Sequence, residues 1–275
     1  MDTYAKHINE KYAADAFTAQ SEVFDELYGI NTIINYKRER VRNHVLHYLT
    51  AGSSILELNS GTGDDAIFFA ENGHKVHATD LSEGMQQQLM IKVQQRKFNP
   101  FITNELCSYT TLDQLKNKGP YDLVFSNFAG LNCTDELDKV LASLPALLNP
   151  GGLVTLVILP KFCLWETLLL FKGKFRAAFR RLFSSKGRTA HIDGNYFKCW
   201  YYNPQYITNR LKDQFDVLNI EGLCTIVPPS YFEGFAEKHP STYNFLKKQE
   251  ERLKSRWPWK YIGDYYIISL RKKLG

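Results

Sequence analysis

The sequence contains few cysteines, and their spacing argues against two cysteine-based structural features. There are five in 275 residues, and no two of them form a Cys-x-x-Cys pair. A disulfide framework or a structural zinc site is therefore not expected, and we predict no bound metal. The scattered positions are Cys107, Cys133, Cys163, Cys199 and Cys224.

Long apolar runs, a leader-like start and strong charge are also missing. No run reaches the length of a transmembrane helix, and the first residues, Met-Asp-Thr-Tyr-Ala-Lys, contain no apolar core of a signal peptide. We therefore expect a cytoplasmic protein. The formal net charge is only +5, and no extended basic run accompanies it. A nucleic-acid partner is accordingly not expected.

What the sequence does contain is a glycine turn between two strand-like segments. Residues 55–65 read Ile-Leu-Glu-Leu-Asn-Ser-Gly-Thr-Gly-Asp-Asp, and residues 75–82 read Lys-Val-His-Ala-Thr-Asp-Leu-Ser. Gly61 and Gly63 allow a ligand to approach the backbone, and the helix that follows directs free N–H groups toward it. Asp80 ends the second strand, where a carboxylate can accept hydrogen bonds from both hydroxyls of a ribose. The pattern predicts an adenosine-binding corner.

Two cofactors fit such a corner, and nearby acids separate them. The glycine spacing and the downstream acid satisfy the nicotinamide-dinucleotide fingerprint. However, Glu57 before the turn, and Asp64 and Asp65 after it, would repel a pyrophosphate. S-adenosylmethionine (SAM) has no pyrophosphate and carries an ammonium group, which an acid near the turn can hold. We therefore predict SAM, and keep an NAD-dependent dehydrogenase as the weaker alternative.

Four segments, in order, resemble the class I SAM-dependent methyltransferases. They are Glu-Leu-Asn-Ser-Gly-Thr-Gly at 57–63, Ala-Thr-Asp-Leu-Ser-Glu-Gly-Met at 78–85, Tyr-Asp-Leu-Val-Phe-Ser-Asn-Phe at 121–128, and Leu-Leu-Asn-Pro-Gly-Gly-Leu at 147–153. The resemblance covers about residues 53–160 well and the remainder in outline. It implies that SAM is held by Tyr28, Glu57, Asn59, Gly61, Gly63, Asp80, Leu81, Met85, Ser108, Asn127 and Phe128.

Two positions depart from the family pattern. Asn59 stands where the family usually has glycine, although asparagine tolerates unusual backbone angles better than most residues. Ser108 stands where many members have an acid that bonds the adenine amine. A serine hydroxyl or a backbone carbonyl would have to replace that contact.

The alternation of strands and helices predicts an α/β fold. We expect a doubly wound, Rossmann-like sheet, and the resemblance implies seven strands, mostly parallel, with an antiparallel last strand and helical lid insertions. The expected parts are an N-terminal helical cap at 1–50, a SAM-binding core at 51–160, a lid or substrate insertion at 161–200, and the rest of the core at 201–275, with an inserted helix at 230–255. Glu57, Asp80, Ser108 and Asn127 would then share one rim.

Methyl transfer requires alignment and exclusion of water, and a base only if the acceptor must lose a proton. Tyr201, Tyr202 and His191, and also His7, are candidate bases, but none has the fixed partner that would define a catalytic role. A structural or surface role is the alternative for each of them. The chain lacks the Asn-Pro-Pro-aromatic sequence of methylases that act on the amines of nucleic-acid bases.

Residues 162–183 of the insertion combine an apolar stripe with a basic flank. Trp165, Phe175 and Phe179 share the stripe; Lys172, Lys174, Arg176, Arg180 and Arg181 lie largely elsewhere. Three interpretations remain open: a lid that packs on the core, a pocket for an apolar acceptor, or peripheral contact with an anionic membrane.

These features together predict a SAM-dependent methyltransferase that modifies a small or medium-sized, largely apolar acceptor. The acceptor is expected to be a lipid-like or secondary metabolite, methylated on oxygen or carbon. The alternative is a regulatory protein of the same fold that binds SAM without transferring the methyl group. The sequence does not predict the oligomeric state.

Overall fold

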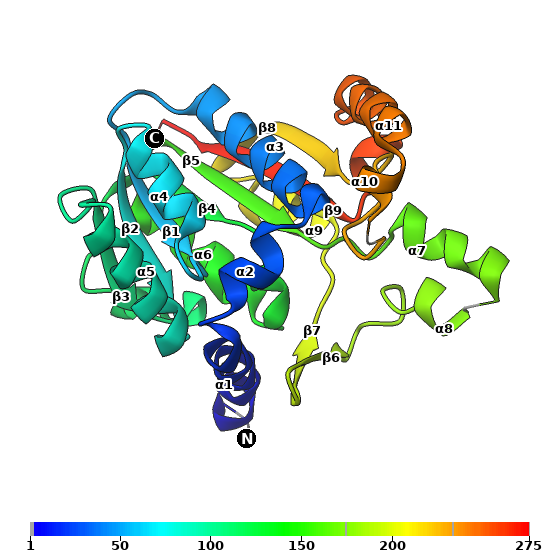
Figure 1. Ribbon diagram of the computed structural model, residues 1–275. Coiled ribbons are helices and arrows are strands. Elements are labelled where there is room, and N and C mark those ends of the chain that lie inside the picture. The colour runs from blue at the N-terminus through cyan, green and yellow to red at the C-terminus, as the bar shows by residue number, and fades with distance from the viewer. Residues whose placement is uncertain (1–2, 174, 233, 275) are drawn as a thin grey trace.

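A single seven-stranded sheet organises the computed structural model, which describes residues 3–173, 175–232 and 234–274. The strand order is β3-β2-β1-β4-β5-β9-β8 (Figure 1). Strands β1 to β5 are parallel, and β9 is antiparallel to both of its neighbours. This arrangement confirms the predicted fold class. The strands are Ser54–Leu58 (β1), Lys75–Asp80 (β2), Ile102–Leu106 (β3), Tyr121–Ser126 (β4), Leu148–Ile158 (β5), Phe215–Leu223 (β8) and Tyr265–Lys272 (β9).

Helices cover both faces of this sheet (Figure 1). One face carries α3 (Thr32–Tyr48), α4 (Asp64–Glu71) and α5 (Glu83–Gln95), and the other carries α6 (Leu137–Leu147) and α9 (Pro204–Leu211). Because both faces are covered, strands such as β4 are apolar on both sides. Short 3₁₀ turns occupy Tyr109–Gln114, Gly130–Cys133 and Trp259–Tyr261.

The N-terminal segment, expected as a helical cap, forms three helices. α1 (Thr3–Gln20) ends before α2 (Phe24–Gly29), so the aromatic residues Phe17, Phe24 and Tyr28 come from two helices. Their rings meet, with centroids 6.4 Å apart for Phe17 and Phe24 and 4.6 Å apart for Phe24 and Tyr28. Leu27 on α2 is 51 % exposed.

The insertion after β5 is only partly helical. It begins with α7 (Leu164–Leu168), a 3₁₀ turn (Leu169–Lys172) and α8 (Phe175–Ala178), and it ends in a hairpin of β6 (Arg188–Ile192) and β7 (Asn195–Cys199). The insertion therefore contains the expected helices together with a hairpin that was not predicted. The missed signal was Asp193-Gly194, a favoured two-residue hairpin turn, and both residues have positive φ.

The expected helix at 230–255 is broken in two. α10 (Phe235–Lys238) and α11 (Pro240–Leu253) are separate because proline lacks an N–H and disfavours helical angles in the residue before it. The buried carboxylate of Glu250 on α11 accepts hydrogen bonds from the backbone N–H groups of residues 224–227. This contact fixes the loop that follows β8.

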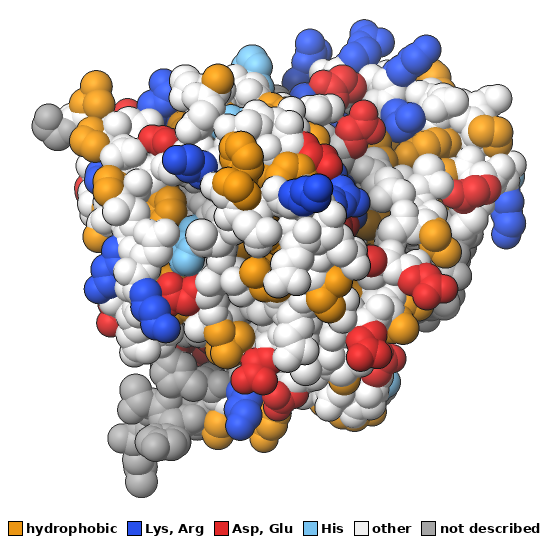
Figure 2. Space-filling view, turned by 60° about the vertical axis from the view of Figure 1, so that its left-hand side comes forward, with side chains coloured by type: hydrophobic (Ala, Val, Ile, Leu, Met, Phe, Trp, Pro, Cys, Tyr) orange, Lys and Arg blue, Asp and Glu red, His pale blue; other side chains and the backbone are white. Residues whose placement is uncertain are grey.

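The surface charges and the helices are relevant to two further expectations, that no nucleic acid binds and that no helix spans a membrane. On the face shown in Figure 2, Lys and Arg side chains are interspersed with Asp and Glu and do not gather into one basic field. Among the described residues, none of the helices is both long and apolar enough to cross a membrane.

Candidate cofactor site

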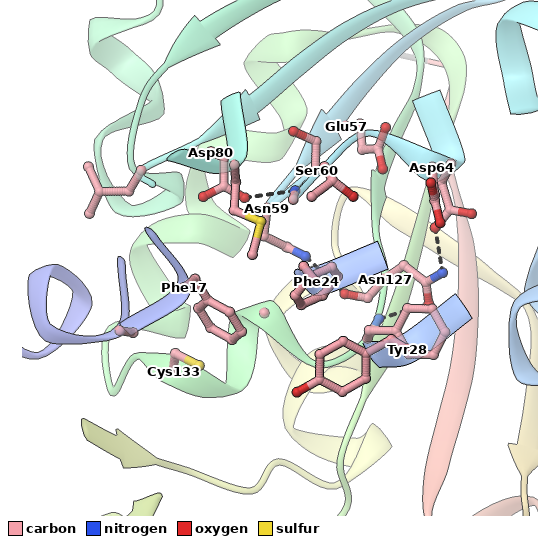
Figure 3. A pocket seen from close by; sticks show the side chains of 18 of the residues that line it. Phe17, Phe24, Tyr28, Glu57, Asn59, Ser60, Asp64, Asp80, Asn127 and Cys133 are labelled. Atoms are coloured by element: carbon pink, nitrogen blue, oxygen red, sulfur yellow. Dashed lines mark hydrogen bonds between the residues drawn. The ribbon is translucent and has the colours of Figure 1, made fainter. Parts of the chain in front are cut away.

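A cavity of about 360 Å³ lies between the carboxyl ends of the central strands and the helices α1 and α2 (Figure 3). Ligands of doubly wound sheets bind at this edge. The structure brings most of the predicted cofactor residues to this cavity, whereas Gly63 and Ser108 do not line it. The lining residues among them are Tyr28, Glu57, Asn59, Gly61, Asp80, Leu81, Met85, Asn127 and Phe128.

Asp80 is held in place by backbone N–H groups. Gly61 N–H donates to Oδ2 and Ser82 N–H donates to Oδ1, both at 2.9 Å. Burial raises the pKa of Asp80, and the hydrogen bonds from these N–H groups partly counter that rise. Each oxygen has a further lone pair, so the carboxylate can accept hydrogen bonds from two adjacent hydroxyls.

Glu57 is a buried acid, and none of the described residues forms an ion pair with it. It is 2 % exposed, and its Oε2 has no hydrogen-bond partner among the described residues. Burial, together with the nearby charge of Asp65, raises its pKa well above the ordinary 4.5, although Arg42 opposes the shift. A buried polar atom left unpaired is costly, so this position suits a ligand that donates hydrogen bonds and carries positive charge. The ammonium group of SAM has both properties.

The glycine turn forms despite Asn59. Asn59 adopts φ +48°, and its side chain joins the turn to the loop after β4. Asn59 Nδ2 donates to the Asn127 carbonyl at 2.9 Å, and Ser126 Oγ donates to Asn59 Oδ1 at 2.6 Å. A Cβ at Gly130 would lie 2.2 Å from Asn59 Cγ, so the two loops meet too closely for a side chain there.

Gly63 is required for packing. It has φ +80°, and a Cβ there would lie 2.0 Å from Leu89 Cδ1 on α5. Any side chain would therefore separate α4 from α5. Contact of Gly63 with the cofactor stays a prediction.

The loop after β4 is strained at the edge of the cavity. Phe128 and Ala129 both adopt left-handed backbone angles, with φ +48° and +60°. Each such residue costs on the order of 1–3 kcal/mol, and strain of this kind concentrates at functional sites. Asn127 supports the loop, because its Nδ2 donates to Asp65 at 2.7 Å and its Oδ1 accepts the Phe128 N–H at 2.8 Å.

Glu10 is a cavity residue that sequence reasoning missed. Its carboxylate is 4 % exposed and accepts hydrogen bonds from three hydroxyls. These belong to Ser108, Thr110 and Thr134. Ser108 therefore orients Glu10 instead of facing the cavity itself. No local pattern could have revealed this pairing, because Glu10 and Ser108 are 98 positions apart.

The N-terminal helices close the cavity through contacts to the sheet. Asp25 on α2 accepts a hydrogen bond from Thr62 in the glycine turn and pairs with Lys92 of α5. Thr18 on α1 bonds to Ser82 at 2.8 Å. Phe17, Phe24 and Tyr28 therefore form an aromatic wall across the cavity (Figure 3).

The candidate bases lie elsewhere. Tyr202 donates its hydroxyl to the Thr134 carbonyl at 2.6 Å, and Tyr201 packs under the guanidinium of Arg181. His191 Nε2 accepts the Gly194 N–H within the hairpin. None of the three lines the cavity, and each has a structural contact. The side chain of His7 lies outside the described residues.

Arg38 and Arg40 on α3 differ in their position relative to the cavity. Arg38 lines the cavity and pairs with Asp64 at 2.7 Å. Burial opposes the ionisation of Asp64, but Arg38 and Lys92 hold its pKa below the ordinary value. Arg40 does not line the cavity, because it is buried between Glu221 and Glu250.

The stripe expected in the insertion does not line the cavity either. Trp165 packs on Phe232, whereas Phe175 and Phe179 are 63 % and 38 % exposed. Arg181, which was expected on the surface flank, is buried and pairs with Glu166 at 2.6 Å and Asp264 at 2.7 Å. The side chains of Lys172 and Arg176 are not described, and Lys174 lies outside the described residues.

The strand order, the acid-flanked glycine turn and the carboxylate at the end of β2 define a Rossmann-like SAM-binding domain. Residues 55–152 match a family model described as "Methyltransferase domain". Over these residues the chain is similar to the class I SAM-dependent methyltransferases, and SAM is the cofactor inferred from that family.

Two curated relatives share this domain. An uncharacterized methyltransferase of Synechocystis sp. is 25 % identical over 131 residues, which cover 46 % of this chain and 58 % of the relative. Demethylmenaquinone methyltransferase of Lactococcus lactis is 26 % identical over 189 residues, which cover 66 % and 70 %. The match therefore spans a little over half of the first relative.

Solved structures share the fold at low identity. The 1,6-didemethyltoxoflavin-N1-methyltransferase of Burkholderia thailandensis, with its substrate and S-adenosylhomocysteine bound, has a TM-score of 0.58 at 15 % identity, covering 99 % of this chain and 92 % of its own. Geranyl diphosphate C-methyltransferase of Streptomyces coelicolor has a TM-score of 0.55 at 13 % identity, covering 86 % and 79 %.

Proposed function

We propose that the protein transfers the methyl group of SAM to a small or medium-sized, largely apolar acceptor, on oxygen or carbon. The observation that carries this proposal is one cavity that is lined by two kinds of side chain. The acids Asp80 and Glu57 and the aromatic rings of Phe24, Tyr28 and Phe128 all line it. Aromatic rings suit both a sulfonium and an apolar acceptor.

The residues on the rim give SAM one orientation. The adenine lies toward Glu10, whose carboxylate can accept a hydrogen bond from the adenine amine. The ribose lies on Asp80, and the amino group lies toward Glu57. When bound, SAM supplies a methyl group already activated by its positive sulfur. These assignments are supported by the placement of all three carboxylates along one cavity.

The protein then has to align the acceptor and exclude water. The contacts of Asp25 with Thr62 and Lys92 hold α2 over the cavity, which keeps water from the reacting atoms. The strained loop at Phe128 fixes one wall, so the acceptor is placed without reorganisation of the backbone. No proton transfer to Tyr201, Tyr202 or His191 is required.

Support for the acceptor class comes from the lining and from the relatives. The names of the Lactococcus, Burkholderia and Streptomyces enzymes all state small-molecule substrates. The exact acceptor of this chain is not given by them, because identities of 13–26 % carry the fold and the cofactor chemistry rather than the substrate.

The insertion supports a further part of the proposal, contact with an anionic membrane that presents the acceptor. Phe171, Phe175 and Phe183 are 89 %, 63 % and 70 % exposed. Residues 171–188 contain several Lys and Arg residues and no Asp or Glu. Exposed aromatic rings among basic residues suit the interface of an anionic bilayer.

Calorimetry and a transfer assay test the proposal. Purified protein should bind SAM and S-adenosylhomocysteine in the micromolar range and NAD negligibly. Radiolabelled SAM should then pass its methyl group to members of a panel of phenols, quinols and prenylated acids. Saturable binding of NAD without binding of SAM would overturn the cofactor assignment. Tight SAM binding with no transfer across the panel would favour the regulatory alternative.

A further inference from the structure

The cavity contains a buried ammonium group that the cofactor assignment does not use. Lys37 on α3 is 3 % exposed and lines the cavity. Its Nζ donates to Ser230 Oγ at 3.2 Å and lies 3.8 Å from Asp264 Oδ2. An ammonium has three N–H donors, so the contact with Ser230 leaves donors available for a ligand.

The local charges leave this site with an excess of positive charge. Asp264, the nearest acid, is bound more closely by Arg181, at 2.7 Å. Arg181 also pairs with Glu166, as does Arg180. The cluster therefore contains three cations and two carboxylates. A buried cation that is only partly neutralised favours an anionic ligand.

The position of Lys37 separates it from the groups assigned to the cofactor. Glu57 and Asp80 lie at the ends of the neighbouring strands β1 and β2, and Asn127 follows β4. Lys37 instead lies over the ring of Tyr265 on β9, 4.7 Å from its centroid, and β9 is two strands beyond β4. It is also 5.8 Å from the centroid of Phe128, which lines the same cavity.

We propose that Lys37 and Ser230 bind an anionic oxygen of the methyl acceptor, as a carboxylate, phenolate or enolate. This inference rests on the proposed function and names the acceptor class more closely: an apolar molecule with one acidic oxygen. A phenol or enol bound beside the ammonium gives its proton to solvent before transfer. The acceptor's electron pair then forms the bond to the methyl carbon, the carbon–sulfur bond breaks, and the sulfonium leaves as the neutral thioether. The scheme accounts for methyl transfer without a general base at the site.

The test compares a charged probe with a neutral probe of similar shape. Calorimetry would measure the binding of 2-naphthoate and 2-naphthamide to protein saturated with S-adenosylhomocysteine. The wild type should prefer the anion by at least roughly tenfold, as expected for a charge-assisted hydrogen bond. Lys37→Met should remove that preference, and Ser230→Ala should reduce it while leaving the ammonium in place. Lys248→Met changes an exposed lysine on α11 and should preserve the preference.

Each result decides a specific point. Failure of the wild type to bind S-adenosylhomocysteine would contradict the proposed function itself. Normal cofactor binding without preference for 2-naphthoate would overturn this inference alone, as would a preference that survives in Lys37→Met. Weaker binding of S-adenosylhomocysteine to Lys37→Met would also overturn it, because the ammonium would then hold the cofactor carboxylate. If Lys37→Met unfolds, Ser230→Ala decides the question: a reduced preference supports the inference, and an unchanged preference overturns it.

Discussion

The hydroxyl of Ser108 donates a hydrogen bond to the carboxylate of Glu10, and this contact joins the end of β3 to the N-terminal helix. Where relatives are expected to have an acid on the strand, this chain has a serine that orients an acid from α1. The acid that we propose to bind the adenine therefore reaches the cavity only when α1 is docked. On this proposal, closure of the helix and recognition of the purine are coupled.

We predict that Glu10→Gln reduces selectivity for the adenine amine. The carboxylate of the wild type can accept from that amine but would repel the carbonyl of a 6-oxopurine. The wild type should therefore bind S-adenosylhomocysteine more tightly than S-inosylhomocysteine, by roughly tenfold or more. Glu10→Gln should bring the two affinities close together, as measured by calorimetry. Glu22→Gln, on a residue outside the cavity, is the control. If wild type and Glu10→Gln discriminate equally between S-adenosylhomocysteine and S-inosylhomocysteine, another group binds the adenine amine.

A second prediction concerns Asp80, whose carboxylate has two roles. Asp80→Ala removes two charge-assisted hydrogen bonds to the ribose, each worth roughly 1.5–3 kcal/mol, so affinity for S-adenosylhomocysteine should fall about a hundredfold or more. The same carboxylate also accepts the N–H groups of Gly61 and Ser82. The free protein should therefore lose roughly 1–3 kcal/mol of stability. Calorimetry and denaturant unfolding measure the two effects. Unchanged affinity would place the ribose elsewhere.

The sequence predicted the sheet and much of the cofactor corner, because both follow from local patterns. Strand–turn–helix order, the glycine spacing and the acids after β1 and β2 are all short-range features. Lys37 and Glu10 could not be predicted in this way. The position of each side chain depends on a partner that is distant in the sequence. Lys37 donates to Ser230, and Glu10 accepts from Ser108.

The insertion shows why periodicity misled at residues 162–183. The stripe of Trp165, Phe175 and Phe179 was predicted from helical spacing, which holds only within one helix, whereas Gly173 adopts φ +70° and lies between α7 and α8. Arg181 counted as a surface charge by its helical position, yet tertiary packing buries it between Glu166 and Asp264. Charge reversal at Arg181 would therefore test folding instead of membrane binding.

Membrane contact is better tested at the exposed aromatic residues. The double variant Phe171→Ser with Phe183→Ser should abolish co-sedimentation with phosphatidylglycerol vesicles, since each ring contributes roughly 1.5–3 kcal/mol when buried. Vesicles of phosphatidylcholine alone should bind the wild type less, because the basic residues then lose their partner. Trp257→Ser, at an equally exposed ring outside the insertion, serves as the control. A wild-type protein that stays in the supernatant would leave the insertion with a structural role.

The last prediction follows from the raised pKa of Glu57. In the free protein, burial and nearby acids favour the protonated carboxyl, so Glu57 stabilises the fold below pH 4.5 and that contribution is lost as the pH rises through its raised pKa. A bound ammonium reverses the preference, because it stabilises the carboxylate. Binding of S-adenosylhomocysteine should therefore release a proton from Glu57, and the affinity should increase as the pH rises above 4.5 toward that raised pKa.

Calorimetry in buffers of different ionisation enthalpy measures this proton release directly. Glu57→Gln keeps the shape of the side chain, cannot titrate, and should remove the release together with the pH dependence that it causes. Protons that remain in Glu57→Gln come from groups other than Glu57 and are subtracted from the wild-type value. An identical proton count in the two proteins would mean that Glu57 does not change its protonation state on binding, and it would overturn this prediction.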